Sequence, residues 1–303
     1  MARVNGSVVQ EMAAYRADSQ PRDETSVHDR SIGSILSERK ALSPERIEAI
    51  LAHQREHGVR FGEAAIALGL ATVDDVLWAL SQQFHYPYAP QESRRLTPEL
   101  IALNQPYSHQ AEAFRVIRSQ IAARLKADEG QHAIAVISPD AGDGKTFLAA
   151  NLAVSHAQLG ESTLLIDADM RGPRQHEVFG ISNDAGLSAI LSGRSVNKVI
   201  QQITHIPTLY VLPVGITPPN PLELIERPAF RMLMTELKSK FEHVIVDTPA
   251  AVYGSDASVI ASRCGVALVV ARRNASRISA LQDLVSSVAS APGKLAGVIV
   301  NNF

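Results

Sequence analysis

Residues 139–146 read PDAGDGKT and stand between an apolar run and a helix-forming stretch. A glycine turn at this place can bind phosphate, because its backbone N–H groups converge on the oxygens and the helix N-terminus adds partial positive charge. We expect Lys145 on the β- and γ-phosphates of a nucleotide and the Thr146 hydroxyl on Mg²⁺. Pro139 stands where a standard Walker A motif has its first glycine. The predicted nucleotide contacts are Ala141, Gly142, Asp143, Gly144, Lys145, Thr146 and Phe147. The alternative is a glycine turn with an incidental lysine.

Acidic residues end two further apolar runs. Asp167 and Asp169 lie two residues apart in LLIDADMR, so both can face the same crevice. One carboxylate can help to hold Mg²⁺ while the other accepts a proton from an attacking hydroxyl; a solvated turn is the alternative. Asp247 ends HVIVD, where a Walker B carboxylate contacts Mg²⁺ through water. Arg171 is predicted to clamp phosphate or to pair with a carboxylate, and Asp256 to cap a helix.

Short apolar strands alternating with helices are expected to position these residues. The predicted strands are 132–138, 162–167, 208–213, 243–247, 265–271 and 295–301. The predicted helices are 109–125, 145–159, 221–240, 256–263 and 276–291. Fully apolar strands separated by helices indicate a mostly parallel sheet covered on both faces. We therefore predict a doubly wound α/β P-loop NTPase domain over residues 106–303, preceded by a small helical domain.

The N-terminal third contains an internal repeat with a period of 29 residues, in which Gly33 matches Gly62 and Ser43 matches Thr72. Ser43 and Thr72 each precede a helical pattern as N-caps, and Pro44 suits a first helical position. Each unit reads as helix, turn and helix, and the two should pack as one small domain. We expect a disordered lead at 1–30, this domain at 31–88 and a linker at 89–105.

The composition argues against several other classes of protein. The formal net charge of −2 does not suggest a nucleic-acid partner or direct binding to a membrane surface. The single cysteine, Cys264, excludes an internal disulfide and is expected to be a buried hydrophobe. No apolar run approaches the roughly 20 residues that span a bilayer, and the first residues lack a signal-peptide core. We therefore expect a cytoplasmic protein.

Two further patterns allow two interpretations each. Glu112, Arg115 and Arg118 follow one another at spacings of three on the predicted helix 109–125. They can form intrahelical pairs, or the arginines can make bidentate contacts across a subunit interface. Residues 215–225, which hold three prolines, could form a wall beside the adenine or simply start a helix at Pro221.

The linked motifs PDAGDGKT, LLIDADMR and VIVDTPA resemble those of the bacterial tyrosine autokinases of capsule and exopolysaccharide operons. The resemblance covers residues 106–303 and is nearest to the exosortase-linked, EpsG-type kinases. It implies an ATP- and Mg²⁺-dependent protein-tyrosine kinase that regulates chain length or export with a membrane-embedded copolymerase. It implies Asp167 and Asp247 at magnesium, Asp169 as base, and a homo-oligomer assembled through Glu112, Arg115 and Arg118.

One feature departs from that family's pattern. Its members usually carry a tyrosine cluster in a C-terminal tail, whereas this sequence ends at Phe303 and its six tyrosines are scattered. We therefore expect the acceptor tyrosine elsewhere in the chain or on a partner. One alternative is an ATPase switch of the partition or cell-division type, which would place a lysine where Asp140 stands. Another is a non-catalytic module that uses nucleotide to organise the copolymerase.

The repeat resembles a second family, the N-terminal domain of secretion and pilus ATPases that binds cyclic di-GMP through two tandem motifs. The second motif, opening at Arg60 and Gly62, is close to that pattern. In the first motif Gly33 is kept, but Ser31 replaces the arginine and Lys40 replaces a glycine. The resemblance implies cyclic di-GMP binding through Gly33, Arg60 and Gly62; the alternative is a small helical docking module.

Overall fold

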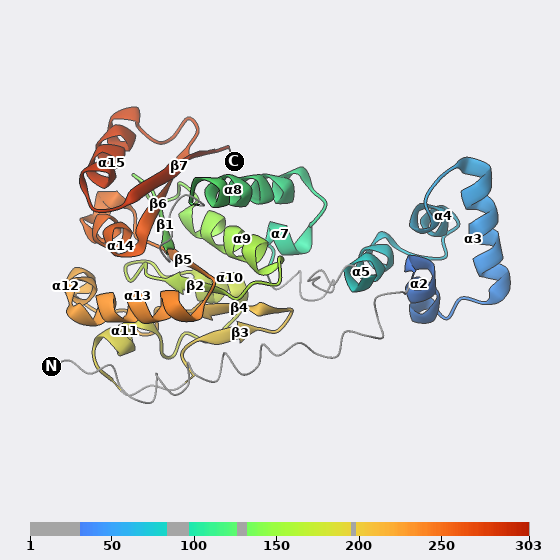
Figure 1. The fold of residues 1–303 in the computed structure, drawn as a ribbon, viewed down its shortest axis with the longest axis horizontal. Coiled ribbons are helices and arrows are strands. Elements are labelled where there is room, and N and C mark those ends of the chain that lie inside the picture. The colour runs from blue at the N-terminus through green and yellow to red at the C-terminus, as the bar shows by residue number, and fades with distance from the viewer. Residues whose placement is uncertain (1–30, 84–96, 126–131, 195–197, 303) are drawn as a thin grey trace. The chain divides into compact units, whose positions relative to one another are not determined.

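The computed structural model describes residues 31–83, 97–125, 132–194 and 198–302 (Figure 1). These residues divide between two compact units, one on each side of the boundary near residue 96. The predicted disordered lead at 1–30 and residues 89–96 of the predicted linker lie outside the described residues.

Residues 31–83, the described part of the smaller unit, form four helices in two helix–turn–helix pairs. They are α2 (Ile32–Lys40), α3 (Pro44–His57), α4 (Phe61–Ala67) and α5 (Val73–Gln83). The second pair repeats the first, and Pro44 is the first residue of its helix, as the sequence predicted. Ile35, Leu36 and Ile50 from the first pair pack with Ala64 and Ala79 from the second. Neither pair encloses this core by itself, so the two pairs form one folding unit.

Charged side chains also join the two pairs. Asp75 of α5 accepts an ion pair from Lys40 of α2 at 2.7 Å and another from Arg39 at 3.4 Å. The Arg39 guanidinium also lies 4.2 Å from the centre of the Trp78 ring. Burial raises the pKa of Asp75, but hydrogen bonds from Lys40 and Thr72 outweigh burial and lower it to about 2. Lys40, which departs from the secretion-ATPase pattern, therefore connects the repeats.

The larger unit is built on a seven-stranded sheet in the order β3-β4-β2-β5-β1-β6-β7. Its strands are β1 (Ala133–Ile137), β2 (Thr163–Asp167), β3 (Gln201–Ile203), β4 (Ile206–Leu212), β5 (His243–Asp247), β6 (Gly265–Arg272) and β7 (Lys294–Asn301). All neighbours are parallel except β3 and β4. The predicted doubly wound fold is confirmed, and the antiparallel edge strand β3 was missed because three residues carry no usable periodicity.

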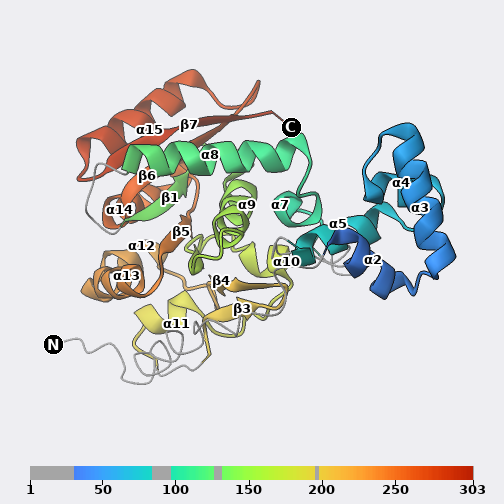
Figure 2. The ribbon, with the colours of Figure 1, turned by 45° about the vertical axis from the view of Figure 1, so that its right-hand side comes forward.

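Helices cover both faces of this sheet. α8 (His109–Leu125) and α9 (Lys145–Ala157) lie on one face, and α12 (Pro221–Glu226), α13 (Pro228–Lys240), α14 (Asp256–Cys264) and α15 (Ile278–Ser290) lie on the other, as Figures 1 and 2 show. The predicted helix 221–240 is two helices, because the extended backbone that precedes Pro228 breaks it. Cys264 is fully buried, as predicted, and burial raises the pKa of its thiol to about 12.

The end of the predicted linker belongs to the larger unit. α7 (Ile101–Asn104) packs against α9 through Asn151, whose side chain is fully buried. The Asn151 amide accepts from Ala102 N at 2.9 Å and donates to Glu99 O at 2.9 Å. Gln158 donates to Ala102 O at 2.8 Å. These contacts bring residues 98–101 to the edge of the candidate site.

Candidate functional site

A cavity of about 970 Å³ opens beside the N-terminus of α9. It is lined by Pro98, Glu99, Ile101, Gln110, Ala141, Gly142, Gly144, Lys145, Thr146, Phe147, Asp169, Arg171, Gly172, Arg174, Tyr253, Asn301 and Asn302. Most of the residues predicted for nucleotide binding therefore line one cavity. The proline segment 215–225 does not contribute to its lining, and Pro221 begins α12, which agrees with the simpler interpretation.

The turn before α9 has the backbone of a phosphate-binding loop. Gly142 and Gly144 take positive φ values of 81° and 98°, which side chains other than glycine rarely adopt. The turn leads directly into α9, whose first residue is Lys145. Lys145 is only 6% exposed yet lines the cavity at the start of α9, where the partial positive charge of the helix would attract a phosphate.

Asp143 differs from the other predicted nucleotide contacts because its side chain is buried and makes hydrogen bonds within the protein. Its carboxylate accepts from Ser276 Oγ at 2.7 Å and from Asp140 N at 3.0 Å. Asn301, at the end of β7, donates to Asp143 O at 3.1 Å. The side chain is 2% exposed and does not line the cavity. Asp143 thus connects the phosphate-binding turn to the segment after β6, through Ser276, and to the end of β7, through Asn301.

The three predicted carboxylates have different surroundings. Asp169 lines the cavity, and its Oδ1 accepts from Arg171 N at 3.1 Å and Gly172 N at 3.0 Å. Asp167 is fully buried, with Oδ2 accepting from the backbone N–H groups of Arg174 and Gln175. Burial, and then the charge of neighbouring Asp247, raise the pKa of Asp167 well above its usual value. Of the two residues in the Asp-x-Asp motif, only Asp169 lines the cavity.

Asp247 is held by a residue that the sequence did not single out. Gln175, the first residue of α10 (Gln175–Phe179), is fully buried and donates from Nε2 to Asp247 Oδ2 at 2.9 Å and to Thr146 O at 3.1 Å. Burial raises the pKa of Asp247 to about 6, against the opposing effects of Lys145 and of hydrogen bonds from Thr146 and Gln175. Within the described residues, Asp247 Oδ1 has no hydrogen-bond partner.

Arg171 makes the second of its two predicted contacts. Its guanidinium is 3.0 Å from Oδ2 of Asp256, which is 1% exposed at the start of α14. Asp256 therefore pairs with an arginine, and it is the first residue of α14, whose N-cap is Ser255 rather than the predicted Asp256. The pair links the loop after β2 to the loop after β5, at the rim of the cavity. A second pair, between Arg174 and Glu99 at 2.7 Å, links the α7 segment to the same rim.

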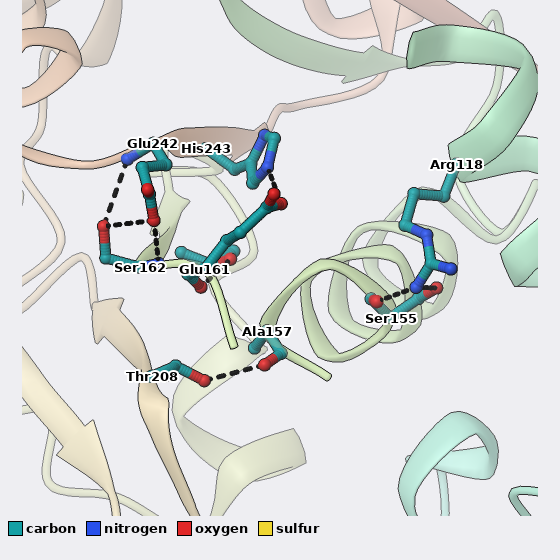
Figure 3. A network of polar contacts seen from close by, with 9 residues as sticks. Arg118, Ser155, Ala157, Glu161, Ser162, Thr208, Glu242 and His243 are labelled. Carbon is teal, nitrogen blue, oxygen red and sulfur yellow. Dashed lines mark hydrogen bonds and ion pairs between the residues drawn. The ribbon is translucent and has the colours of Figure 1, made fainter. Parts of the chain in front are cut away.

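The predicted interface residues on α8 make contacts inside the unit. Arg115 pairs with Glu112 at 2.7 Å and donates to Pro106 O. Arg118 points toward α9 and donates to the backbone oxygen and hydroxyl of Ser155 (Figure 3). These contacts agree with the intrahelical pairing of Glu112 and Arg115, and the interface role of the three residues stays a prediction.

In the smaller unit, the two repeat glycines lie at helix contacts. A Cβ on Gly62 would come within 2.6 Å of Val76, and one on Gly33 would meet the Phe61 ring at 3.4 Å. Packing therefore explains Gly62, whereas a Cβ on Gly33 would make an ordinary van der Waals contact, so packing does not require glycine there. Arg60 is exposed, and its backbone N–H donates to Glu63 Oε2 at 2.8 Å at the start of α4. Its guanidinium stands at the surface, where a ligand could reach it.

Across the described ranges, no helix combines the length and apolarity needed to cross a bilayer. The finding agrees with the hydropathy of the sequence.

Known proteins match the larger unit. The family described as CobQ/CobB/MinD/ParA nucleotide binding domain matches residues 134–303. Tyrosine-protein kinase YwqD of Bacillus subtilis is 32% identical over 207 residues, which are 68% of this chain and 87% of that protein. The solved kinase domain of the Escherichia coli tyrosine kinase Etk is 33% identical, with a TM-score of 0.62 over 67% of this chain and 79% of that domain.

Some relatives are much longer than the matched part. Tyrosine-protein kinase Wzc of Salmonella typhimurium is 32% identical over 206 residues, but these are only 28% of its length. The chain therefore spans most of some relatives and about a quarter of others. The residues that the family model matches, 134–303, include both the phosphate-binding turn and the three carboxylates.

Proposed function

The chain belongs to the family of bacterial tyrosine-protein kinases built on the CobQ/CobB/MinD/ParA nucleotide-binding domain, and we propose that it transfers the γ-phosphoryl group of ATP to tyrosine. The observation that carries the proposal is that Lys145, Thr146 and Asp169 line one cavity. A P-loop lysine and a carboxylate free to take a proton are the parts that such a transfer needs.

In this proposal each residue has a separate task. Lys145 and the backbone N–H groups of the turn hold the phosphates and stabilise the charge of the transferring group. Asp169 accepts the proton as the tyrosine oxygen bonds to the γ-phosphorus and the bond to the ADP oxygen breaks. Arg171, paired with Asp256, orients the loop that carries Asp169. Gln175 fixes the carboxylate of Asp247.

Mg²⁺ fits the oxygen atoms beside the turn. Asp247 offers a buried oxygen that lacks a hydrogen-bond partner among the described residues, and the Thr146 hydroxyl lies next to the same carboxylate. Hard oxygen ligands of this kind suit Mg²⁺, which would neutralise phosphate charge when bound with ATP. Asp167 fits less directly, because backbone N–H groups already occupy both of its oxygens. We propose Thr146 and Asp247 as the principal metal contacts.

Phosphotyrosine formation by the full chain with ATP and Mg²⁺ tests this function. Lys145→Ala and Asp169→Ala should each abolish it, whereas Asp283→Asn on the exposed face of α15 should not. ATP hydrolysis that persists without phosphotyrosine would favour the ATPase switch. Nucleotide binding without turnover would favour the non-catalytic module.

We also propose that the kinase acts in the cytoplasm on exopolysaccharide export, together with a membrane-embedded copolymerase and as a homo-oligomer. Supporting this, the region resembling this chain makes up nearly all of YwqD but only about a quarter of Wzc. A kinase of this type thus occurs both as a short chain and within a larger one. Cytoplasmic segments of the copolymerase should stimulate phosphotyrosine formation, and no stimulation would remove this partner from the proposal.

For the smaller unit we propose binding of cyclic di-GMP. The proposal is supported by the paired repeats and by the exposed Arg60, whose guanidinium can make bidentate contacts to phosphate or guanine. Calorimetric titration of the full chain should show binding that Arg60→Ala weakens and Arg55→Ala, an exposed arginine of the same unit, leaves unchanged. The absence of binding at high micromolar ligand would favour a helical docking module.

A further inference from the structure

Three side chains capable of binding metal lie together where the central strands β2 and β5 begin, at the opposite end of these strands from Asp167 and Asp247. His156 lies in the last turn of α9, Glu161 two residues before β2, and His243 begins β5. One ligand atom of each lies within 4.8 Å of the others. Figure 3 shows the contact between His243 and Glu161. His243 Nε2 and Glu161 Oε2 are 2.6 Å apart, and the ring centroids of His156 and His243 are 4.1 Å apart.

This cluster is separate from the candidate kinase site. His243 pairs with Thr163 where β5 and β2 begin, whereas Asp247 and Asp167 end the same strands. Four strand residues at about 3.3 Å each place the two sites roughly 13 Å apart. None of the three residues has a part in the proposed phosphoryl transfer, so the cluster requires its own explanation.

His156 is the residue that points to a ligand. It is 3% exposed, and neither ring nitrogen has a hydrogen-bond partner within the described part of the chain. Buried polar groups nearly always have a hydrogen-bond partner, because an unpaired one loses its hydrogen bonds to water and gains none in the protein. Burial first, and then the charges of His243 and Arg118, lower the pKa of His156 to about 3. The imidazole is therefore neutral at physiological pH and keeps a lone pair available.

We propose that His156, Glu161 and His243 bind a divalent transition metal, with Zn²⁺ as the best match. Two imidazole nitrogens and one carboxylate oxygen form a donor set that Zn²⁺ uses, and water would complete a tetrahedron. The Glu161 and His243 side chains are 44% and 29% exposed, so an ion can enter from solvent. Once bound, it would join the end of α9 to the starts of β2 and β5.

Binding would replace the hydrogen bond between His243 and Glu161 with bonds to the metal. On a neutral imidazole the proton between His243 Nε2 and Glu161 Oε2 would move to Nδ1, which frees the Nε2 lone pair, while His156 would supply a second lone pair. The positive charge of Arg118 nearby opposes a cation, and the Glu161 carboxylate offsets it. Arg118 itself is engaged with Ser155, directly before His156 (Figure 3).

The test is Zn²⁺ binding to the full chain without an affinity tag, measured by calorimetry, together with Co²⁺ absorption spectra. We expect one strong site per chain and a raised Tm. Glu161→Gln and His243→Gln, both partly exposed, should weaken binding at least about 10-fold, as loss of even an outer partner does. Circular dichroism would verify that both variants fold.

A second histidine pair supplies the matched control. His53 and His57 of α3 stack at 4.0 Å and can bind Zn²⁺ independently of the proposed site. His57→Gln should leave the strong site intact, and excess Mg²⁺ should not compete for it. Loss of the strong site in His57→Gln, or its survival in both Glu161→Gln and His243→Gln, would overturn the proposal.

Discussion

Gln175 donates from its side-chain nitrogen to the carboxylate of Asp247 at 2.9 Å, and both side chains are buried. The same nitrogen is 3.1 Å from Thr146 O in the first turn of α9. One amide therefore joins the Walker B carboxylate to the helix that carries the phosphate-binding lysine. Because a hydrogen bond to a charged group is worth about 1.5–3 kcal/mol, the contact should affect catalysis.

Gln175→Met tests this contact while nearly preserving side-chain volume. We expect kcat for phosphotyrosine formation to fall at least about 10-fold, since about 1.4 kcal/mol corresponds to a factor of 10. Removal of the donor should also raise the pKa of Asp247, so the acid limb of the pH profile should move to higher pH. Gln202→Met on edge strand β3 is the control. An unchanged kcat and pH profile in Gln175→Met would remove Gln175 from the proposed mechanism.

Asp247→Asn should stabilise the nucleotide-free protein at pH 7 while abolishing kinase activity. Burial raises the pKa of Asp247 from 3.8 to about 6, so the folded state holds more protons than the unfolded chain between these values. Its contribution to stability therefore falls as pH rises from about 4 to about 6 and stays low above that window. The effect is at most about 3 kcal/mol, since one pKa unit is about 1.4 kcal/mol.

Thermal unfolding at pH 4, 5, 6 and 7 measures this effect. Asp247→Asn should raise Tm most at pH 7 and least at pH 4. The control, Asp283→Asn, removes an exposed carboxylate and should follow the wild-type profile. A Tm difference that is the same at every pH would contradict titration of Asp247 as the cause.

The Arg171–Asp256 pair should respond unequally to loss of its two members. Asp256 is 1% exposed, whereas the Arg171 side chain is 34% exposed. Removing Arg171 therefore leaves a buried carboxylate without its ion pair, while removing Asp256 leaves an arginine that water can still reach. Arg171→Ala should destabilise the protein by about 3 kcal/mol, because breaking a buried pair leaves an uncompensated charge. Asp256→Asn should cost less. Chemical denaturation provides the comparison, and equal losses would show that Arg171 matters for packing alone.

Tyrosine exposure predicts where phosphate can be added within the described residues. Tyr253 and Tyr107 are 53% and 60% exposed, whereas Tyr210 is 8% exposed, and Tyr253 also lines the nucleotide cavity. Tyr15, Tyr86 and Tyr88 lie outside the described residues. Mass spectrometry after incubation with ATP should find phosphate on Tyr253 or Tyr107 before Tyr210. Tyr253→Phe should leave modification of Tyr107 unchanged, and phosphate mainly on Tyr210 would contradict the order.

The sequence alone determined the fold class, the kinase family and the place of the phosphate-binding turn. These follow from local causes: fully apolar runs make buried strands, and Gly142, Gly144 and Lys145 act within a single turn. The comparisons confirm the family, and the sheet order confirms the doubly wound fold. The roles of individual site residues stay predictions.

Only the tertiary structure decided where the polar side chains point. Asp143 turns away from the cavity toward Ser276, a partner 133 residues away. Arg171 lines the cavity and pairs with Asp256, 85 residues away. Gln175 belongs to no motif and matters only because β5 places Asp247 beside it. Residues 97–104 were predicted as linker from the sequence, but in the structure the Asn151 side chain makes hydrogen bonds to their backbone. In each case a contact between segments far apart in the sequence determines how a residue is positioned, and the spacing of residues along the sequence does not predict such contacts.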